Sequence, residues 1–171
     1  RIDGIKNIEF ARSIVIDAKS SRMKPNTNLY FFIDGEDYND SVYPKIFRNI
    51  TRTVNSTSFV VGEKVRIESQ SDPGTNQIIA EVVVASKYDS TITANYSGAS
   101  TVIAIDNVTT VDGTLLNPSS PTDKVKITGL TTGAVAEVDL TSPRISTNDE
   151  GTVDFFILVP PEKLETGKSR L

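Results

Sequence analysis

A short aromatic run between two turns constrains this chain most, because it predicts a sharply bounded β-strand over residues 29–33. On its amino-terminal side, Pro25 fixes its own φ and favours an extended residue before it, while Asn26 suits a turn. On its other side, Asp34 and Gly35 form a turn signal that ends the strand. The run itself consists of strand-forming residues. We therefore expect a core strand here that carries no chemistry.

A second aromatic run near the other end of the chain has the same character. Residues 153–159 follow Gly151 and are halted by two prolines, the first of which is Pro160. A proline cannot donate a hydrogen bond to a strand ladder, so the strand must end there. The run contains Phe155 and Phe156, and it also predicts a core strand.

Adjacent aromatic residues in a strand point to opposite faces, so both runs carry aromatic rings on two sides. Two interpretations stay open: both faces are buried within one domain, or one face packs against a neighbouring domain or subunit. We expect Phe32 and Phe156 to be buried, and truncation of either to alanine to cost about 3–5 kcal/mol. The candidates for structural or assembly roles are Pro25, Tyr30, Phe32, Asp34, Gly35, Gly129, Gly133, Phe155, Phe156 and Pro160.

Composition predicts a soluble, nearly all-β protein without a nucleic-acid or membrane partner. The 171 residues are 37% hydrophobic and 23% charged, which suffices to bury a core as one domain or two small ones. Valine and isoleucine dominate the apolar residues, and turn residues recur at short intervals. The net charge of −4 argues against a surface for phosphates, which requires clustered Lys and Arg. No apolar run reaches the length of a membrane-spanning helix.

The middle of the chain contains two similar strand–turn–strand patterns with alternating apolar positions. The patterns are residues 64–67 with 80–83, and residues 124–127 with 136–139. Gly129 and Gly133 are expected to adopt turn conformations rather than to bind phosphate, because no helix is predicted after them. Either the two hairpins form a barrel-like module with internal pseudo-symmetry, or the similarity of short valine-rich hairpins is accidental.

The change of strand pattern at Phe59 predicts an inserted module. We expect an immunoglobulin-like β-sandwich built from residues 1–58 and 141–171, carrying a small β-barrel-like module at residues 59–140. An unbroken tandem of two domains is the alternative.

Three connecting segments complete this interpretation. Residues 14–16 are expected to form a strand that leads into 29–33, as a hairpin or a sheet-crossing pair. Residues 37–52 are polar with interspersed apolar positions, and they fit a loop with either a helical turn or a strand. Residues 100–116 are expected to supply a central strand and turn between the two hairpins, and residues 117–122 a surface loop.

The chain contains no histidine and no cysteine. It therefore has no imidazole base, no thiol nucleophile and none of the usual zinc ligands. The densest carboxylate cluster is Asp34, Glu36, Asp37 and Asp40. It lacks the spacing of a calcium loop, so a solvated turn is favoured over a metal or glycosidase site. The basic residues Lys45, Arg48 and Arg52 are expected to form a solvated loop surface. We predict no enzyme activity, no cofactor and no metal.

Five short motifs occur in order along the chain, at residues 23–35, 62–65, 96–106, 129–138 and 149–167. The first has a proline, asparagine and threonine before its aromatic run and Asp34-Gly35 after it. The second is Gly62-Glu63-Lys64-Val65, and the fourth has two glycines followed by alternating alanine and valine. Together these motifs resemble virion structural proteins of tailed bacteriophages, in particular proteins of the tail, baseplate or fibres of contractile-tailed cyanophages.

The resemblance implies a non-enzymatic structural domain of a phage tail, baseplate or tail fibre, located in the virion. Such a domain acts by assembly with other virion structural proteins, and the resemblance implies a homo-oligomer, as a trimer or a ring. A chain that continues beyond this segment is also expected. Two other functions stay open: a carbohydrate-binding or adhesin module that recognises a host surface glycan, and a hydrolase with paired carboxylates.

Overall fold

The computed structural model describes residues 14–37, 39–52, 57–71, 73–74, 77–110, 124–140 and 144–159. Over these ranges the protein is nearly all β, as the composition predicts, and its helices are two short 3-10 turns. The strands are β1 (Ile14–Ser20), β2 (Asn28–Leu29), β3 (Phe32–Ile33), β4 (Glu36–Asp37), β5 (Val42–Pro44), β6 (Ile46–Arg48), β7 (Thr51–Arg52), β8 (Lys64–Ser69), β9 (Gln77–Val83), β10 (Val102–Thr110), β11 (Lys124–Gly129), β12 (Val135–Asp139), β13 (Ile145–Ser146) and β14 (Val153–Val159); the helices are η1 (Asn39–Ser41) and η2 (Ala85–Lys87).

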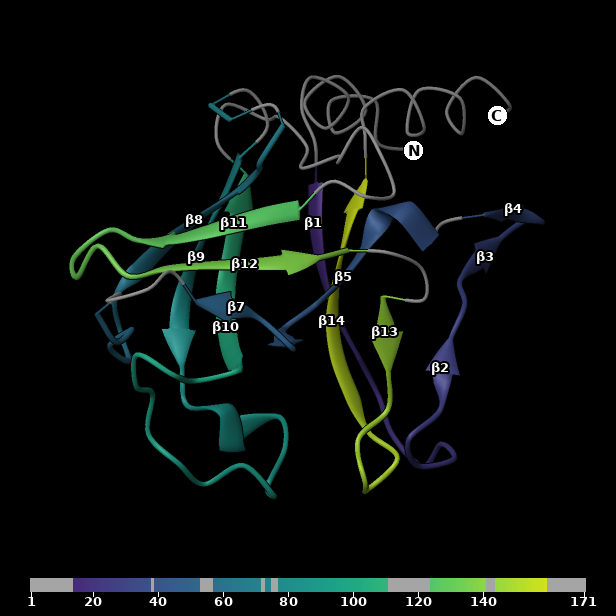
Figure 1. Ribbon diagram of the computed structural model, residues 1–171. Helices are drawn as coiled ribbons and strands as arrows, with labels where there is room; N and C mark the ends of the chain where they lie inside the picture. Colours follow the sequence, from purple (N-terminus) through teal and green to yellow (C-terminus); the bar gives the residue numbers. More distant parts are fainter. Residues whose placement is uncertain are drawn as a thin grey trace.

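A three-stranded antiparallel sheet in the order β1-β14-β5 joins the two ends of the chain (Figure 1). β1 and β14 pair along their full length, from Ile14 opposite Val159 to Ser20 opposite Val153. The first of the two expected arrangements, a hairpin between residues 14–16 and 29–33, is therefore wrong, whereas the second, a crossing between sheets, agrees with β2 and β3 lying in other ladders than β1. A continuous ladder with apolar pairs such as Val15 with Leu158 outweighs a contact with a segment that forms only two-residue strands.

The second sheet has seven strands in the order β6-β10-β9-β8-β11-β12-β7 and curls into a half-barrel (Figure 1). The two predicted hairpins, β8–β9 and β11–β12, are confirmed as antiparallel pairs at its centre. Their first strands pair with each other, and Ile67 lies opposite Ile127. These two isoleucines hold equivalent places in the two sequence patterns, so the pairing has the local two-fold arrangement of related hairpins.

β10 occupies a different place from the one that the sequence predicts. It lies beside β9, outside both hairpins, and not between them. The reason is that β8 and β11 pair directly, with buried Val65 and Ile67 beside buried Val125 and Ile127, and leave no room for a strand.

Residues 42–52, which we call the seam segment, connect the two sheets. Its three short strands pair in turn with different partners: β5 with β14, β6 with β10, and β7 with β12. β6 and β7 are the two edges of the half-barrel, and only Asn49 and Ile50 separate them along the chain. The edges therefore lie close together. The sequence left this region open between a loop, a helical turn and a strand.

One core lies between the half-barrel and the three-stranded sheet. Tyr43 of the seam segment stacks on Phe156 of β14, with 5.3 Å between the ring centroids. Both rings are buried, and they share a core with barrel residues such as Ile67 and Ile127. The three-stranded sheet thus packs one face on the half-barrel.

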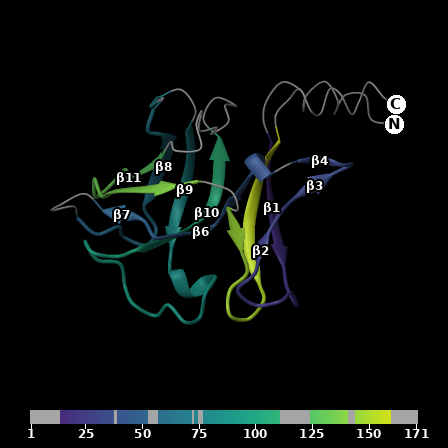
Figure 2. The same ribbon diagram turned by 45° about the vertical axis from the view of Figure 1, so that its right-hand side comes forward.

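A second and smaller core covers the opposite face of the three-stranded sheet. It contains Val42, Val153 and Phe155, with Leu29 and Phe31 packed against them. The rings of Phe31 and Phe155 are 4.9 Å apart. The layer above this core, which we call the outer layer, consists of the two-residue ladders β2–β13 and β3–β4 (Figure 2).

The first aromatic run is interrupted, so the prediction of one strand over 29–33 is wrong. β2 ends at Leu29, β3 begins at Phe32, and Tyr30 and Phe31 lie between them. Phe32 is 63% exposed and Tyr30 is 57% exposed, which also corrects the expectation that Phe32 is buried. Among the described residues, the three-stranded sheet is the surface on which a ring of this run can be buried, and Phe31 packs there. Tyr30 and Phe32 alternate with Phe31 and point away from that sheet.

Candidate functional site

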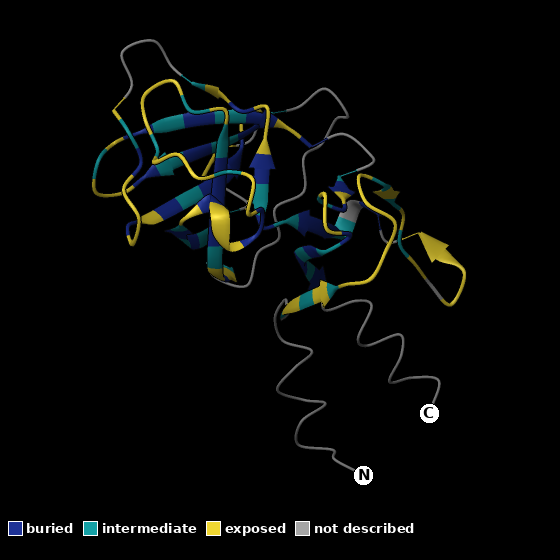
Figure 3. Cartoon of the chain, turned by 90° about the horizontal axis from the view of Figure 1, so that it is seen from below, coloured by how far each residue is buried: buried dark blue, intermediate teal, exposed yellow. Residues whose placement is uncertain are grey.

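The densest carboxylate cluster lies on the β3–β4 hairpin. Asp34, Glu36 and Asp37 are exposed, and Asp37 accepts a hydrogen bond from the Asn39 backbone N–H at 2.7 Å. The side chain of Asp40 lies outside the described part. Among the described residues, no three His, Cys, Asp or Glu residues are grouped to hold a metal ion. The hairpin is an exposed acidic element at the side of the molecule (Figure 3).

The predicted turn of this hairpin is confirmed. Asp34 and Gly35 have φ angles of 53° and 81°, which is the left-handed backbone that a two-residue hairpin turn requires. Gly133 has a φ of 76° in the turn between β11 and β12, as expected of a turn glycine. Pro25 is exposed in a turn, whereas Phe155 and Phe156 are buried. Pro160 lies outside the described residues.

The basic residues of the seam segment do not form the solvated loop surface that the sequence predicts. Lys45 is only 6% exposed. Its Nζ atom lies 3.0 Å from a carboxylate oxygen of Asp17 and 2.9 Å from one of Asp106. Lys87 contacts the other oxygen of Asp106 at 2.5 Å. These four residues link β1, the seam segment, η2 and β10.

Both arginines of the cluster also have specific partners. Arg48 pairs with the buried Asp89 at 2.5 Å. Arg52 donates from Nε to the Val135 carbonyl at 3.0 Å, and its guanidinium lies 4.7 Å from the centroid of the Phe59 ring. The sequence expectation fails because Arg48 and Arg52 lie in the edge strands of the half-barrel and Lys45 lies where the chain passes from one sheet to the other, so each cation meets acceptors from neighbouring elements.

The charges of the Lys45 network are held in their ionised forms. Burial lowers the pKa of Lys45, but its hydrogen bonds to Asp106 and Asp17 outweigh burial and raise the pKa overall. Burial raises the pKa of Asp106, but hydrogen bonds from Lys87 and Lys45 outweigh it and hold the pKa well below its usual range. A nucleophilic amine must lose its proton, and a general acid must keep one at the working pH. The network is therefore suited to a structural link between the two sheets.

A second buried charge, Glu63, holds two loops together. Its carboxylate accepts hydrogen bonds from the Val60 backbone N–H at 2.7 Å, and from Thr131 and Thr132 at 3.2 and 3.1 Å. Burial raises the pKa of Glu63, but the hydrogen bonds from Val60, Thr132 and Thr131 outweigh burial and lower the pKa overall. A Cβ atom on Gly129 would lie 2.6 Å from the Glu63 Oε1 atom, so a side chain there would have to displace the hydrogen-bonded carboxylate.

The first and last sequence motifs also meet in space. The Met23 backbone N–H donates to the Gly151 carbonyl at 3.0 Å, and the Asn26 N–H donates to the Asn148 carbonyl at 3.1 Å. A Cβ atom on Gly151 would lie 2.0 Å from the Met23 carbonyl oxygen. Like the contact of Glu63 with Gly129, this pairing explains the motif residues by structure.

A groove of about 240 Å³ lies beside the seam segment. β12 runs past the end of the two-residue β7 at this point, so the groove marks where the half-barrel is not closed. Arg144 reaches over the ring of Tyr43 at 4.8 Å, and its Nε donates to the Leu140 carbonyl at 3.1 Å. The lining includes Phe47, Arg48, Asn49, Asp139, Arg144 and Asp154.

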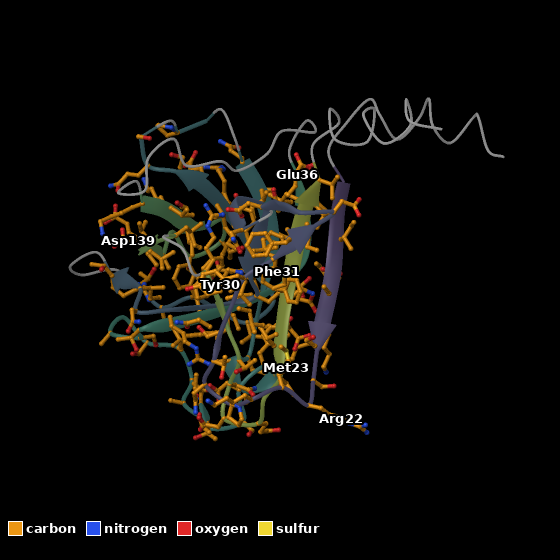
Figure 4. All side chains as sticks on the ribbon, turned by 90° about the vertical axis from the view of Figure 1, so that its right-hand side faces the viewer. Arg22, Met23, Tyr30, Phe31, Glu36 and Asp139 are labelled. Carbon is orange, nitrogen blue, oxygen red and sulfur yellow. The ribbon has the colours of Figure 1, made fainter. Side chains whose placement is uncertain are left out.

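Large apolar side chains are exposed on the outer layer, on the turn that precedes it and on the edge strand β1. We call the set Ile16, Met23, Tyr30 and Phe32 the outer aromatic face, and their exposed fractions are 44, 36, 57 and 63%. Figure 4 labels Met23 and Tyr30 on this side of the molecule, whereas Phe31 packs on the smaller core. An exposed apolar patch on a protein surface is typical of a binding or assembly site.

Comparisons with protein-family models, with curated proteins and with solved structures find no match. Within the part of the chain that the structure describes, no helix has the length and apolar character needed to cross a membrane.

Sequence reasoning missed two buried charges, Glu63 and Lys45. Glu63 was assigned only to a strand start, and Lys45 only to a loop. A signal was present for Glu63, because it stands between a turn glycine and an alternating strand, where a carboxylate accepts backbone N–H groups. For Lys45, whose partners are 28 and 61 residues away, no local pattern contained the information.

Proposed function

We propose that this chain is a non-enzymatic structural domain of a phage tail, baseplate or tail-fibre protein that acts by protein–protein assembly. The observation that carries the proposal is the outer aromatic face, where Tyr30 and Phe32 are exposed on an outer layer made of two-residue ladders, together with Met23 of the preceding turn and Ile16 of β1. Two-stranded ladders of this length are marginal on their own, so contact with another protein would stabilise this layer. The ordered sequence motifs provide the phage context.

Ionisable groups that are buried or half-buried support an assembly role. Lys45, Glu63, Asp89 and Asp106 all have hydrogen-bonding partners inside the protein, and these partners favour their charged forms. The Lys45 network links the two sheets, and Glu63 and Asp89 hold loops within the half-barrel. A rigid scaffold that presents an apolar face is what an assembly domain needs.

A carbohydrate-binding or adhesin module is the second candidate. Its support is the exposure of the Tyr30 ring together with the polar groove that contains Arg48, Arg144 and Asp139. Aromatic rings supply an apolar surface with a polar edge, and charged side chains accept or donate hydrogen bonds to hydroxyl groups.

The architecture that we propose is an immunoglobulin-like sandwich from residues 1–58 and 141–171 with an inserted module at 59–140. The half-barrel and the three-stranded sheet support two structural units. The seam segment, at residues 42–52, contributes to both sheets. The proposed boundary between units therefore falls near a segment that they share.

The proposal is tested on particles that carry this chain. An antibody raised against residues 14–159 should label the tail, baseplate or fibres in electron micrographs. Phage that carries Phe32→Ser should incorporate less of the protein than phage that carries Leu130→Ser, an exposed apolar residue on the half-barrel. Labelling of the head shell, equal incorporation of both variants, or cleavage of a host polysaccharide by the purified domain would overturn the proposal. Glycan binding that is lost in Tyr30→Ser would favour the second candidate.

A further inference from the structure

The outer aromatic face is flanked by opposite charges at its two ends. At one end, the β3–β4 hairpin exposes Asp34, Glu36 and Asp37. At the other end, the turn that follows β1 exposes Arg22 and Lys24. Figure 4 shows this order along the side of the molecule, with Glu36 at one end, Tyr30 and Phe31 in the middle, and Met23 and Arg22 at the other end.

This order makes the face complementary to itself. A two-fold axis through the aromatic middle reverses the direction of the face, so the acidic end of one copy meets the basic end of the other. The apolar middle meets the apolar middle at the same time. A two-fold interface uses the same patch on both subunits, and residue i contacts residue j in both directions.

We propose that the outer aromatic face is the contact surface for a second copy of this chain, in a two-fold antiparallel pair. The inference rests on the proposed assembly function and names its partner. The pair is closed by its own symmetry, and it differs from the trimer or ring that the resemblance implies. Tyr30 and Phe32 supply the central contacts, and Glu36 faces Arg22 of the other copy across each end.

Two acidic residues lie near the basic end. Asp149 and Glu150 lie on the loop that contacts the Met23 turn, and both are exposed. Glu150 accepts a hydrogen bond from Ser90 at 2.6 Å, which draws its carboxylate toward the half-barrel side. Lys19 is not counted at this end, because it alternates with Ala18, faces the half-barrel side of β1 and lies opposite Asp154, which leaves Arg22 and Lys24 against Asp149. The basic end therefore keeps an excess of positive charge despite Asp149.

Salt dependence separates this pairing from unspecific association. The chain carries a net charge of −4, so two copies repel each other overall, and added salt would strengthen an association without charge complementarity. The paired face predicts the opposite, because salt screens the contacts at both ends. The face is small, so we expect a dissociation constant between about 1 μM and about 1 mM.

Analytical ultracentrifugation of the purified chain and of five variants tests the pairing. Phe32→Ser should weaken dimerisation about tenfold or more, whereas Leu130→Ser, in the turn between β11 and β12, should leave it unchanged. Glu36→Lys and Arg22→Asp should each weaken it about tenfold. Aspartate is chosen at position 22 because the φ of Arg22 is 61°, a conformation that aspartate tolerates.

The double variant Glu36→Lys with Arg22→Asp decides the geometry, because each new lysine then faces a new aspartate of the other copy. We expect its dimerisation to return to within about threefold of the wild type. A wild type that stays monomeric up to about 1 mM, a double variant as weak as the single ones, or a wild type that associates more tightly in high salt would overturn the pairing. A monomeric chain that is nevertheless found in the tail would overturn the pairing and leave the proposed function standing.

Discussion

Burial separates two phenylalanines that the sequence treats alike. Phe156 is fully buried against Tyr43, whereas Phe32 is 63% exposed. We expect Phe156→Ala to lower the free energy of unfolding by about 3–5 kcal/mol, the usual cost of truncating a buried phenylalanine. Phe32→Ala should change it by less than about 0.5 kcal/mol, as surface substitutions do. Urea unfolding of the two variants measures both values, and similar losses in the two would contradict the assignment.

Three glycines differ in whether the sequence predicts why glycine occupies the position. Gly35 and Gly133 were expected to be turn residues, and their positive φ angles confirm it. Gly129 was expected to be a turn residue as well, but it ends β11, and its reason is the close approach of the Glu63 carboxylate at 2.6 Å from the place of a Cβ atom. Backbone conformation is local and can be predicted from sequence. The approach of a side chain from 66 positions away along the chain is not local.

At the scale of elements, the seam segment depends on a buried cation. Lys45 lies between β5 and β6, and its two aspartates come from β1 and β10. We expect Lys45→Met to lower the free energy of unfolding by about 2 kcal/mol, because the methionine keeps the volume but leaves Asp106 with one cation fewer. Asp17 contributes little to this loss, since its side chain is 63% exposed.

Lys124→Met is the matched control for this prediction. Lys124 pairs with Asp139 at 3.2 Å, but the two side chains are 41% and 54% exposed, so water screens the pair. Its loss should cost less than about 0.5 kcal/mol. Chemical denaturation of both variants compares the two pairs. Equal effects would show that the Lys45 network does not hold the sheets together.

The length of a strand decided whether it could be predicted from this sequence. The hairpins β8–β9 and β11–β12 were predicted because alternating apolar residues over five or more positions identify a half-buried strand. The strands of the seam segment are two or three residues long, and no periodicity can be read from so few positions. The same limit explains residues 29–33, where a continuous apolar run concealed two short strands. Partners such as β14 for β1 depend on long-range packing.

At the scale of the whole molecule, three carboxylates join separate parts of the fold. Glu63 holds the loop before β8 to the β11–β12 turn, Asp106 holds β10 to Lys45 and Lys87, and Asp89 holds the loop after η2 to Arg48. For each of them burial raises the pKa, but hydrogen bonds outweigh burial and lower it. The folded state thus favours the ionised form at three places at once.

Acid should therefore weaken the fold as a whole. A carboxylate whose pKa is lower in the folded state stabilises the protein fully above its unfolded value of about 4, and this stabilisation is lost as the pH falls through the folded value. We expect the urea midpoint to be nearly constant between about pH 7 and pH 5, and to fall steadily from about pH 5 to pH 2. Asp106→Asn should lower the midpoint at neutral pH and make the fall in acid less steep, because one of the three groups no longer titrates. A midpoint that holds constant down to about pH 3, or an equally steep fall in Asp106→Asn, would show that these carboxylates do not set the stability of the molecule.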